Sequence, residues 1–188
     1  MNDKTDLRII KTNKVLFEAL ITLMREKTFE KIKISDICDV ALINRSTFYA
    51  HYEDKYELLL ALIEDLKDNL LIELKKNEVD SLSKEYFMEL LRILIDHIDK
   101  KRDVYSAILS HNKNGIFIDF LIDVANRDLA KRLKDDQEVI KSNLPVDIIT
   151  KFYLGGIINI GVDWIINPDK YKKEQILLYL DKLIPDKI

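Results

Sequence analysis

The chain has 188 residues, 47% hydrophobic and 34% charged, so it can bury a core and stay in solution. Four glycines and three prolines are too few for the turns of an all-β fold, and a single cysteine excludes a disulfide framework within the chain. The net charge of −3 argues by itself against a nucleic-acid binder, but residues 1–51 carry nine basic and seven acidic side chains, which leaves a weakly basic head on an acidic body.

The start of the chain lacks the basic, apolar and small-residue pattern of a signal peptide. The longest run without a charged residue, 152–162, is well short of the ~20 residues that a helix needs to cross a bilayer. We therefore expect a cytoplasmic protein with no membrane partner.

Hydrophobic periodicity predicts helices through almost the whole chain, and hence an all-α fold class of about nine helices. Leu16, Ala19, Leu20 and Leu23 follow the spacing of one apolar helix face, which predicts a first helix over 6–27. A short helix is expected over 35–42 with Ser35 as its N-cap, followed by about two turns between 44 and 52. The remaining helices are expected at 53–76, 84–100, 102–111, 115–134, 145–166 and 172–184. The polar stretch 77–84 breaks the pattern and is the expected domain junction.

Residues 35–51 are predicted to form a helix, a tight turn and a second short helix, the arrangement of a helix-turn-helix. In this motif the first helix supports the second, whose N-terminal residues enter the major groove of DNA. Five apolar side chains are expected to face the first helix of the chain and to fix the angle between the two short helices: Ile37, Val40, Ala41, Ile43 and Phe48. The outward-facing side chains offer donors for phosphate oxygens and base edges; they are Arg45, Ser46, Thr47 and Tyr49.

From about residue 12 to residue 60 the chain resembles the TetR (tetracycline repressor) family of bacterial transcriptional regulators. The most specific part of the match is NRSTFY at 44–49, followed by His51-Tyr52 and by DKYELL at 54–59. The resemblance implies an N-terminal three-helix helix-turn-helix DNA-binding domain (1–54) and a C-terminal helical ligand and dimerisation domain (55–188). It also implies that DNA is bound by Ser35, Asn44, Arg45, Ser46, Thr47, Tyr49, His51 and Lys55. Among these, Arg45 and Ser46 would read bases, and Thr47, Tyr49, His51 and Lys55 would contact phosphate.

Two positions depart from the family pattern, which usually has glycine where this chain has Thr28 and Leu42. A residue other than glycine in the left-handed conformation costs on the order of 1 kcal/mol. Either the turn avoids that conformation, or packing of Leu42 offsets the cost.

A head of this size contacts one half-site, so a palindromic operator requires a two-fold homodimer. Gly155, Gly156 and Gly161 fall in one predicted helix, where each costs roughly 1 kcal/mol relative to alanine unless another helix approaches closely. The resemblance likewise implies a four-helix bundle of the last two helices from each copy. The expected interface residues are Phe152, Gly155, Gly156, Ile160, Trp164, Leu177, Leu180 and Ile184. The simpler interpretation is that this helix is the centre of the monomer core.

Family members normally hold an effector between the head and the dimerisation helices. Candidate pocket residues are the polar or amphipathic side chains near apolar stripes: His97, Tyr105, His111, Arg127 and Trp164. The simpler account of the two histidines is that they are surface or hydrogen-bonded core residues. The effector is either a small molecule or a protein partner, and no residue pattern indicates its class.

The sequence contains no glycine-rich phosphate loop, no HExxH pair and no CxxC motif. We therefore expect no enzymatic activity, no cofactor and no metal site. The combined pattern predicts a dimeric, sequence-specific DNA-binding transcriptional regulator, a repressor relieved by a bound effector and acting at a palindromic double-stranded operator. The alternative is a helical dimer that binds a ligand or a protein without binding DNA; the acidic balance and Leu42 favour it.

Overall fold

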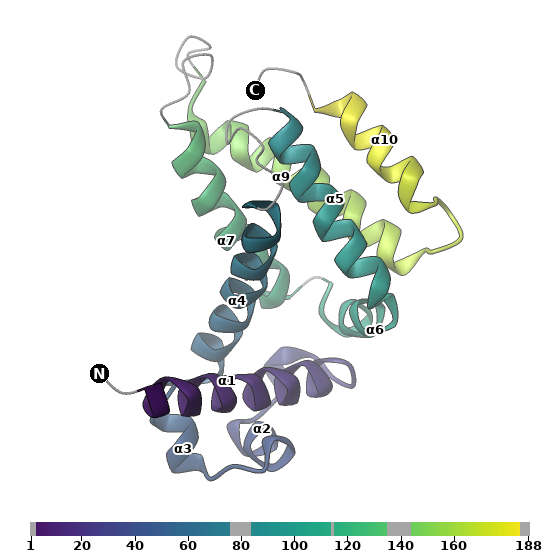
Figure 1. The fold of residues 1–188 in the computed structure, drawn as a ribbon. Helices are drawn as coiled ribbons and strands as arrows, with labels where there is room; N and C mark the ends of the chain where they lie inside the picture. Colours follow the sequence, from purple (N-terminus) through teal and green to yellow (C-terminus); the bar gives the residue numbers. More distant parts are fainter. Residues whose placement is uncertain (1–2, 76–83, 114, 135–143, 185–188) are drawn as a thin grey trace.

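The computed structural model describes residues 3–75, 84–113, 115–134 and 144–184 (Figure 1). Within these residues it has nine α-helices, one 3₁₀ helix and no strand, which confirms the all-α prediction. The elements are α1 (Asp3–Met24), η1 (Phe29–Lys31), α2 (Ile34–Ala41), α3 (Arg45–Tyr49), α4 (Lys55–Lys75), α5 (Lys84–Lys100), α6 (Arg102–Asn112), α7 (Ile116–Leu133), α9 (Val146–Ile166) and α10 (Lys173–Leu183).

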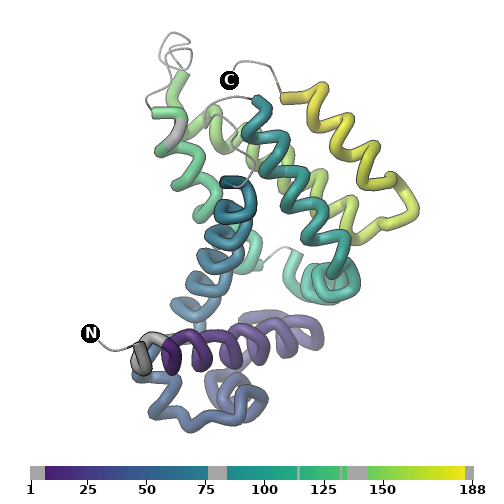
Figure 2. The backbone as a smooth tube through the Cα atoms, in the orientation of Figure 1, coloured from purple at the N-terminus to yellow at the C-terminus, as the bar shows by residue number. Residues whose placement is uncertain are grey.

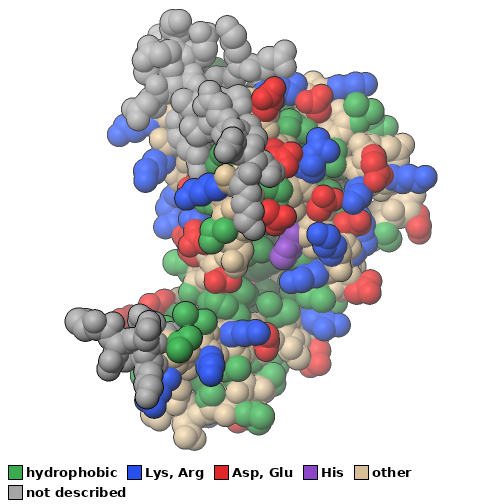
Figure 3. All heavy atoms as spheres, viewed as in Figure 1, with side chains coloured by type: hydrophobic (Ala, Val, Ile, Leu, Met, Phe, Trp, Pro, Cys, Tyr) green, Lys and Arg blue, Asp and Glu red, His purple; other side chains and the backbone are tan. Residues whose placement is uncertain are grey.

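The helices are arranged as a small head and a larger body joined by α4. In Figure 1, α1, α2 and α3 lie together at the lower end, and α4 leads from them into the body formed by α5 to α10. The tube in Figure 2 follows the same path. In the body, α9 packs on α7 and α6, α5 packs on α4 and α10, and α6 also contacts α1 of the head. One face of the surface shows hydrophobic side chains gathered where head and body meet (Figure 3).

A continuous hydrophobic core joins the head to the body. In the head it contains the fully buried side chains of Leu16, Leu20, Phe29, Ile37 and Phe48. The first turns of α4 add Leu58 and Leu59, and the same cluster extends to Trp164 of α9 and Leu180 of α10. Burial of this apolar surface, at about 25 cal/mol per Å² removed from water, is the main force that holds the short helices of the head in place.

Two predicted boundaries differ from the observed ones for local reasons. The first helix ends at Met24 rather than at residue 27, since the amides of Glu26 and Lys27 both donate to the carbonyl of Leu23. The second helix begins at Ile34, so Ser35 lies inside it and is not its N-cap. Lys33 holds that position, and its amide donates to Asp36 Oδ2 at 3.2 Å. The predicted junction at 77–84 lies, apart from Lys84, outside the described residues.

α9 is more apolar than its longest charge-free run suggests. It is 21 residues long and is the one described helix that is long and apolar enough to span a membrane. The sequence-based prediction missed this because it counted only unbroken runs, whereas the charged residues of α9 are few and widely separated. The core helix of a soluble protein meets the same criterion, so this finding is weak evidence for a span. Only 22% of the most apolar window of α9 is buried within the protomer, so most of this apolar stretch is not covered by the rest of the chain.

Candidate nucleic-acid interface

The rear of α3 is formed by Phe48, whose side chain is completely buried in the core of the head. Its ring meets those of Tyr49 and Tyr52 at centroid distances of 5.6 and 6.1 Å. A five-residue helix gains too few backbone hydrogen bonds to be stable alone. Packing of Phe48 therefore holds α3 in place and leaves its opposite face to the solvent.

The turn between α2 and α3 is made in the left-handed conformation, at Leu42. Its φ and ψ are 56° and 42°, and it is the only residue other than glycine with a positive φ in the described part of the chain. The amide of Ile43 donates to Cys38 O at 3.1 Å and that of Leu42 to Asp39 O at 3.4 Å, the paired bonds of a Schellman motif. The Leu42 side chain is 91% exposed, so no packing offsets the strain. Thr28 differs, because its φ of −64° needs no glycine.

Replacing Leu42 with glycine should stabilise the protein. Leu42→Gly relieves the left-handed strain and removes a side chain without packing contacts, so we expect the free energy of unfolding to rise by about 1 kcal/mol. Urea unfolding at fixed protein concentration measures the change. Leu42→Ala is the matched control, because it keeps the Cβ atom and hence the strain. Equal stability of the two variants would contradict this explanation.

The front of α3 presents polar side chains that the head leaves free. Asn44, Arg45, Ser46 and Tyr49 are exposed, with Tyr49 at 57%. Asn44 is the N-cap of α3, but its side chain makes no capping hydrogen bond, and Arg45 forms no ion pair with any described residue. Thr47 is half-buried on the same short helix. The structure therefore brings these expected DNA-binding side chains together on one surface.

Two further predicted residues lie at the edges of this surface. His51 follows α3 and is half-buried beside the Tyr52 ring, at a centroid distance of 6.3 Å. Ser35 is half-buried on α2, where its hydroxyl donates to Asp36 Oδ1 at 3.4 Å. Lys27 pairs with the same carboxylate at 2.6 Å, and this hydrogen bond is the main cause of the lowered pKa of Asp36. The negative charge of Asp36, the acid next to Ser35, is thus already balanced by Lys27 within the head.

The single cysteine lies on the inner side of α2. Cys38 is buried, and burial raises the pKa of its thiol. It packs in the same core as Ile37 and Phe48. Its position is that of a small core residue. Val40 on the same helix was expected to face this core, but it is 45% exposed, since it lies on the outer face of α2.

Lys55 occupies a different environment from the phosphate contact that the resemblance implies. Its ammonium group donates to three carbonyl oxygens around η1, those of Phe29 (3.0 Å), Glu30 (2.8 Å) and Ile32 (2.9 Å). It also lies 4.9 Å from the centroid of the Phe29 ring. Because an ammonium group has three N–H donors, all of them are used inside the head. Burial accordingly lowers the pKa of Lys55.

Removing this ammonium group should destabilise the head. Lys55→Met keeps the apolar stem but leaves three carbonyl oxygens without their donor, so the free energy of unfolding should fall by about 2 kcal/mol. Thermal and urea unfolding measure the loss. Lys31→Met is the matched control, because Lys31 is an exposed lysine in the same turn. If both variants unfold alike, the three carbonyl contacts contribute no stability.

None of the five predicted pocket residues lines either of two open depressions that described residues form at α9 and α10. His97 Nε2 lies 2.8 Å from the hydroxyl of Tyr105, and burial lowers the pKa of His97 and raises that of Tyr105 to about 12, so a neutral pair is favoured. His111 is exposed, and Arg127 is 62% exposed and paired with Glu64 at 2.9 Å. Trp164 is 1% exposed and donates to the carbonyl of Tyr171.

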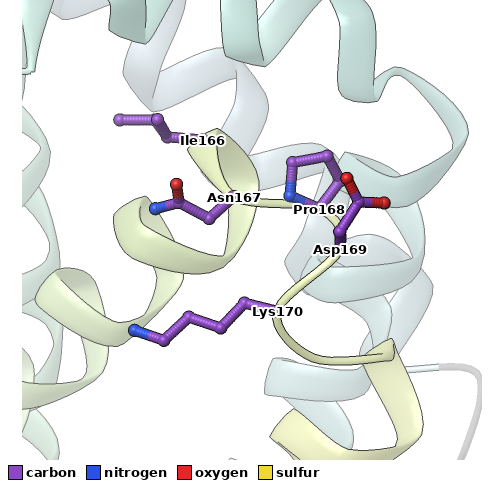
Figure 4. Close-up of a pocket in the computed structure, with 5 residues that line it drawn as sticks. All are labelled: Ile166, Asn167, Pro168, Asp169 and Lys170. Carbon is purple, nitrogen blue, oxygen red and sulfur yellow. The ribbon is translucent and has the colours of Figure 1, made fainter.

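Both open depressions lie at α9 and α10. The first, of about 550 Å³, is formed by residues 166–170 between the two helices (Figure 4). Two of its polar side chains are already engaged, because Lys170 pairs with Asp163 at 2.8 Å and the Asn167 amide donates to the same carboxylate at 2.8 Å. The second, of about 600 Å³, lies between Asn159–Asp163 of α9 and Ile176–Leu183 of α10.

The predicted dimer residues fall into two groups in the protomer. Phe152, Gly155 and Gly156 are exposed on α9, and Ile160 and Leu177 are half-buried. Trp164, Leu180 and Ile184 are buried inside the protomer. Four further apolar residues are exposed on these two helices, although the sequence-based set omitted them: Ile148, Leu178, Tyr179 and Leu183.

Comparison with known proteins identifies the family to which the C-terminal region of the chain belongs. The family model TetR_C_8, described as "Transcriptional regulator C-terminal region", matches residues 85–186, which is more than half of the chain. The chain belongs to the TetR family of transcriptional regulators. Regulators of this family bind DNA operators and small-molecule effectors, and they are not enzymes.

Two curated relatives are transcriptional regulators. The chain is 30% identical over 102 residues to the HTH-type regulator YxbF of Bacillus subtilis, and 29% identical over 103 residues to DhaS, the activator of the dhaKLM operon in Lactococcus lactis. These segments cover 53% and 55% of this chain but 24% and 51% of the relatives. The chain therefore spans about half the length of DhaS and a quarter of YxbF.

Solved structures share the fold over nearly the whole chain. A TetR transcriptional regulator from Streptococcus agalactiae is 27% identical, with a TM-score of 0.64, and the match covers 95% of this chain and 96% of that one. FadR of Thermus thermophilus, solved with lauroyl-CoA, is 18% identical with a TM-score of 0.60, over 91% and 92% of the two chains. The latter similarity shows the fold alone.

Proposed function

We propose that this regulator is a cytoplasmic homodimer that binds a palindromic operator through the exposed face of α3 and represses transcription until an effector binds. The observation that carries the proposal is the free front of α3, with Arg45, Ser46 and Tyr49 exposed, over a buried rear at Phe48. A helix seated in this way can enter a major groove without losing contacts within the head.

The side chains of α3 suggest a division of roles. The guanidinium of Arg45, free of ion pairs among the described residues, has the geometry for two hydrogen bonds to guanine, and Ser46 lies beside it. The hydroxyls of Thr47 and Tyr49 and the imidazole of His51 suit phosphate oxygens. Lys55 acts indirectly in this proposal, since its donors hold the η1 turn.

Selection from a random duplex library tests this division. The wild type should recover a palindrome whose half-site centres are about one helical turn, ~34–36 Å, or a multiple of it apart. Arg45→Ala should relax the preference at one base position by about 1–3 kcal/mol, whereas Tyr49→Ala should weaken binding to all sequences alike. Gel shifts over a series of salt concentrations measure both effects. Equal losses on every sequence for both variants would contradict the assignment, and failure to select any duplex would favour the helical module that does not bind DNA.

The dimer proposal rests on the unpartnered apolar face of α9 and α10. Phe152 is 74% exposed and Leu183 is 65% exposed, and Ile148 and Leu178 are about half exposed. A Cβ atom added at Gly155 or Gly156 would meet nothing within 4 Å. Contacts within the protomer therefore do not explain two adjacent glycines in mid-helix. Close crossing of a second α9 at these glycines explains them, and it accounts for the low burial of this apolar helix.

A two-fold axis near these glycines also accounts for the depression between α9 and α10. Antiparallel crossing of the two copies of α9 at 155–156 would carry Phe152 of each copy toward the half of the other helix that begins at Asn159. That half lines the depression of about 600 Å³. The exposed phenylalanine and the open depression are thus complementary features of one self-associating face.

A charge on this face should separate the dimer. Phe152→Glu should weaken self-association by about 2 kcal/mol, roughly thirtyfold, because it places a carboxylate in an apolar interface. Sedimentation velocity over a concentration series measures the shift. Ile72→Glu is the matched control, since Ile72 is an equally hydrophobic, exposed residue on α4. Dissociation by Ile72→Glu alone would place the interface elsewhere.

Repression is the simplest outcome of operator binding, because a bound dimer needs no further contact to block a promoter. Activation, which the name of DhaS records for that relative, requires an additional contact with the transcription machinery. A reporter gene placed behind the selected operator distinguishes the two: expression should rise when the regulator is deleted, and a fall would show activation instead.

A further inference from the structure

Asn112, at the end of α6, is one of only two polar residues that are buried in the described part of the chain. It is 3% exposed, and its side chain makes three hydrogen bonds. Oδ1 accepts the amide of Phe29 at 2.7 Å, and Nδ2 donates to the carbonyls of Met24 at 3.1 Å and Ile108 at 2.9 Å. An unpaired buried amide would be unfavourable, so these partners fix its position.

Two of these bonds cross from the body to the head. Met24 is the last residue of α1 and Phe29 is the first residue of η1, so each offers a backbone group that has no partner within its own helix. A residue more than 80 positions away supplies both partners. The head thus depends on the body to complete the segment that joins α1 to η1.

The same segment is held from two other sides. Lys55 of α4 donates to the carbonyl of Phe29, so the two backbone polar groups of Phe29 are bound to two different helices. Gly115, the N-cap of α7, lies so close that an added Cβ would be 3.1 Å from Glu30 Oε1. We use the term joint for residues 24–32 together with Lys55, Asn112 and Gly115.

The far end of α6 is anchored to the helix that carries the dimer face. Arg102 donates to the carbonyl of Trp164 at 3.0 Å, and its guanidinium lies 3.9 Å from the centroid of the indole ring. Arg102 also pairs with Asp99 at 3.1 Å. α6 has 11 residues and is therefore about 16 Å long. It forms a short rod between α9 and the joint.

We propose that Asn112 is a positioning residue for operator binding, which fixes the head on the body and so sets the distance between the two α3 helices of the dimer. The inference rests on the proposed function. With Asn112 in place, hydrogen bonds and a ring contact join α9, α6 and η1 in one connected path. Without it, the head keeps its own core and its DNA-contacting side chains but loses its fixed orientation.

The quantity to measure is the preference of the protein for one half-site spacing. A substitution that only lowers the stability of the fold would leave this preference unchanged. One base pair inserted at the centre of the selected palindrome moves the half-sites apart by about 3.4 Å and rotates them by about 35°. The wild type should lose about tenfold or more in affinity for the lengthened operator. Asn112→Ala should lose less than about threefold, while its affinity for a duplex with one half-site stays within about twofold of the wild type.

Two control variants separate positioning from general loosening. Ser110→Ala changes an exposed residue on the same helix and should keep the wild-type spacing preference. Ile93→Ala creates a cavity in the separate cluster of Leu70, Leu74 and Tyr86, and it should also keep the preference despite its lower stability. Asn112→Ser covers the case in which alanine prevents folding, because its hydroxyl can still donate to the carbonyl of Ile108, four residues back, while both bonds to the head are lost.

The outcomes distinguish this inference from the proposal on which it rests. A wild type that selects no duplex would overturn both. A wild type that selects a palindrome, together with Asn112 variants that keep its spacing preference, would overturn the positioning role alone. The positioning role is also overturned if Ile93→Ala relaxes the preference as much as Asn112→Ala does. Relaxed spacing in the Asn112 variants only, with unchanged half-site affinity, supports the role.

Discussion

The burial of Phe48 behind α3 is the contact on which the exposed polar face of this helix depends. A helix of five residues cannot hold its shape through backbone hydrogen bonds alone, so its orientation comes from the side chain that it places in the core of the head. Since one side of α3 is committed to that core, the other side is free to carry polar groups without internal partners. The buried and the exposed side chains therefore occupy adjacent positions of the same short helix and do not compete for them.

Most of the fold could be predicted from the sequence, because apolar spacing along a helix is a local property. The predicted helices at 84–100, 102–111 and 145–166 agree with the observed ends within a residue or two. The exposed front of α3 also followed from local pattern. The role of Lys55 did not, because its three carbonyl partners converge only when η1 packs against α4. Asn112 was missed for the same reason, since its two partners in the head lie more than 80 residues away and a lone asparagine near a helix end carries no signal.

α9 shows where periodicity stops being informative. The residues of α9 are apolar on nearly every face, so the sequence pattern cannot tell which face turns inward. The interface residues were predicted from their apolar character, and they therefore included residues of both faces. Packing separates them: Trp164 and Ile165 turn toward the protomer core, and Phe152 and Ile148 turn toward solvent. One helix thus supplies buried side chains to the protomer core and exposed apolar side chains to its surface. Because Arg102 binds the inner face of α9 and Asn112 binds Met24 and Phe29, α6 connects α9 to the head.

The position of Cys38 has a practical consequence for following the head in solution. The thiol is buried under α2, its pKa is raised by that burial, and the chain has no other cysteine. Oxidants and alkylating reagents act on the exposed thiolate, which the folded head does not offer. The regulator is thus insulated from redox signals at this residue. The rate at which a maleimide dye labels Cys38 therefore reports how readily α2 detaches from the core of the head.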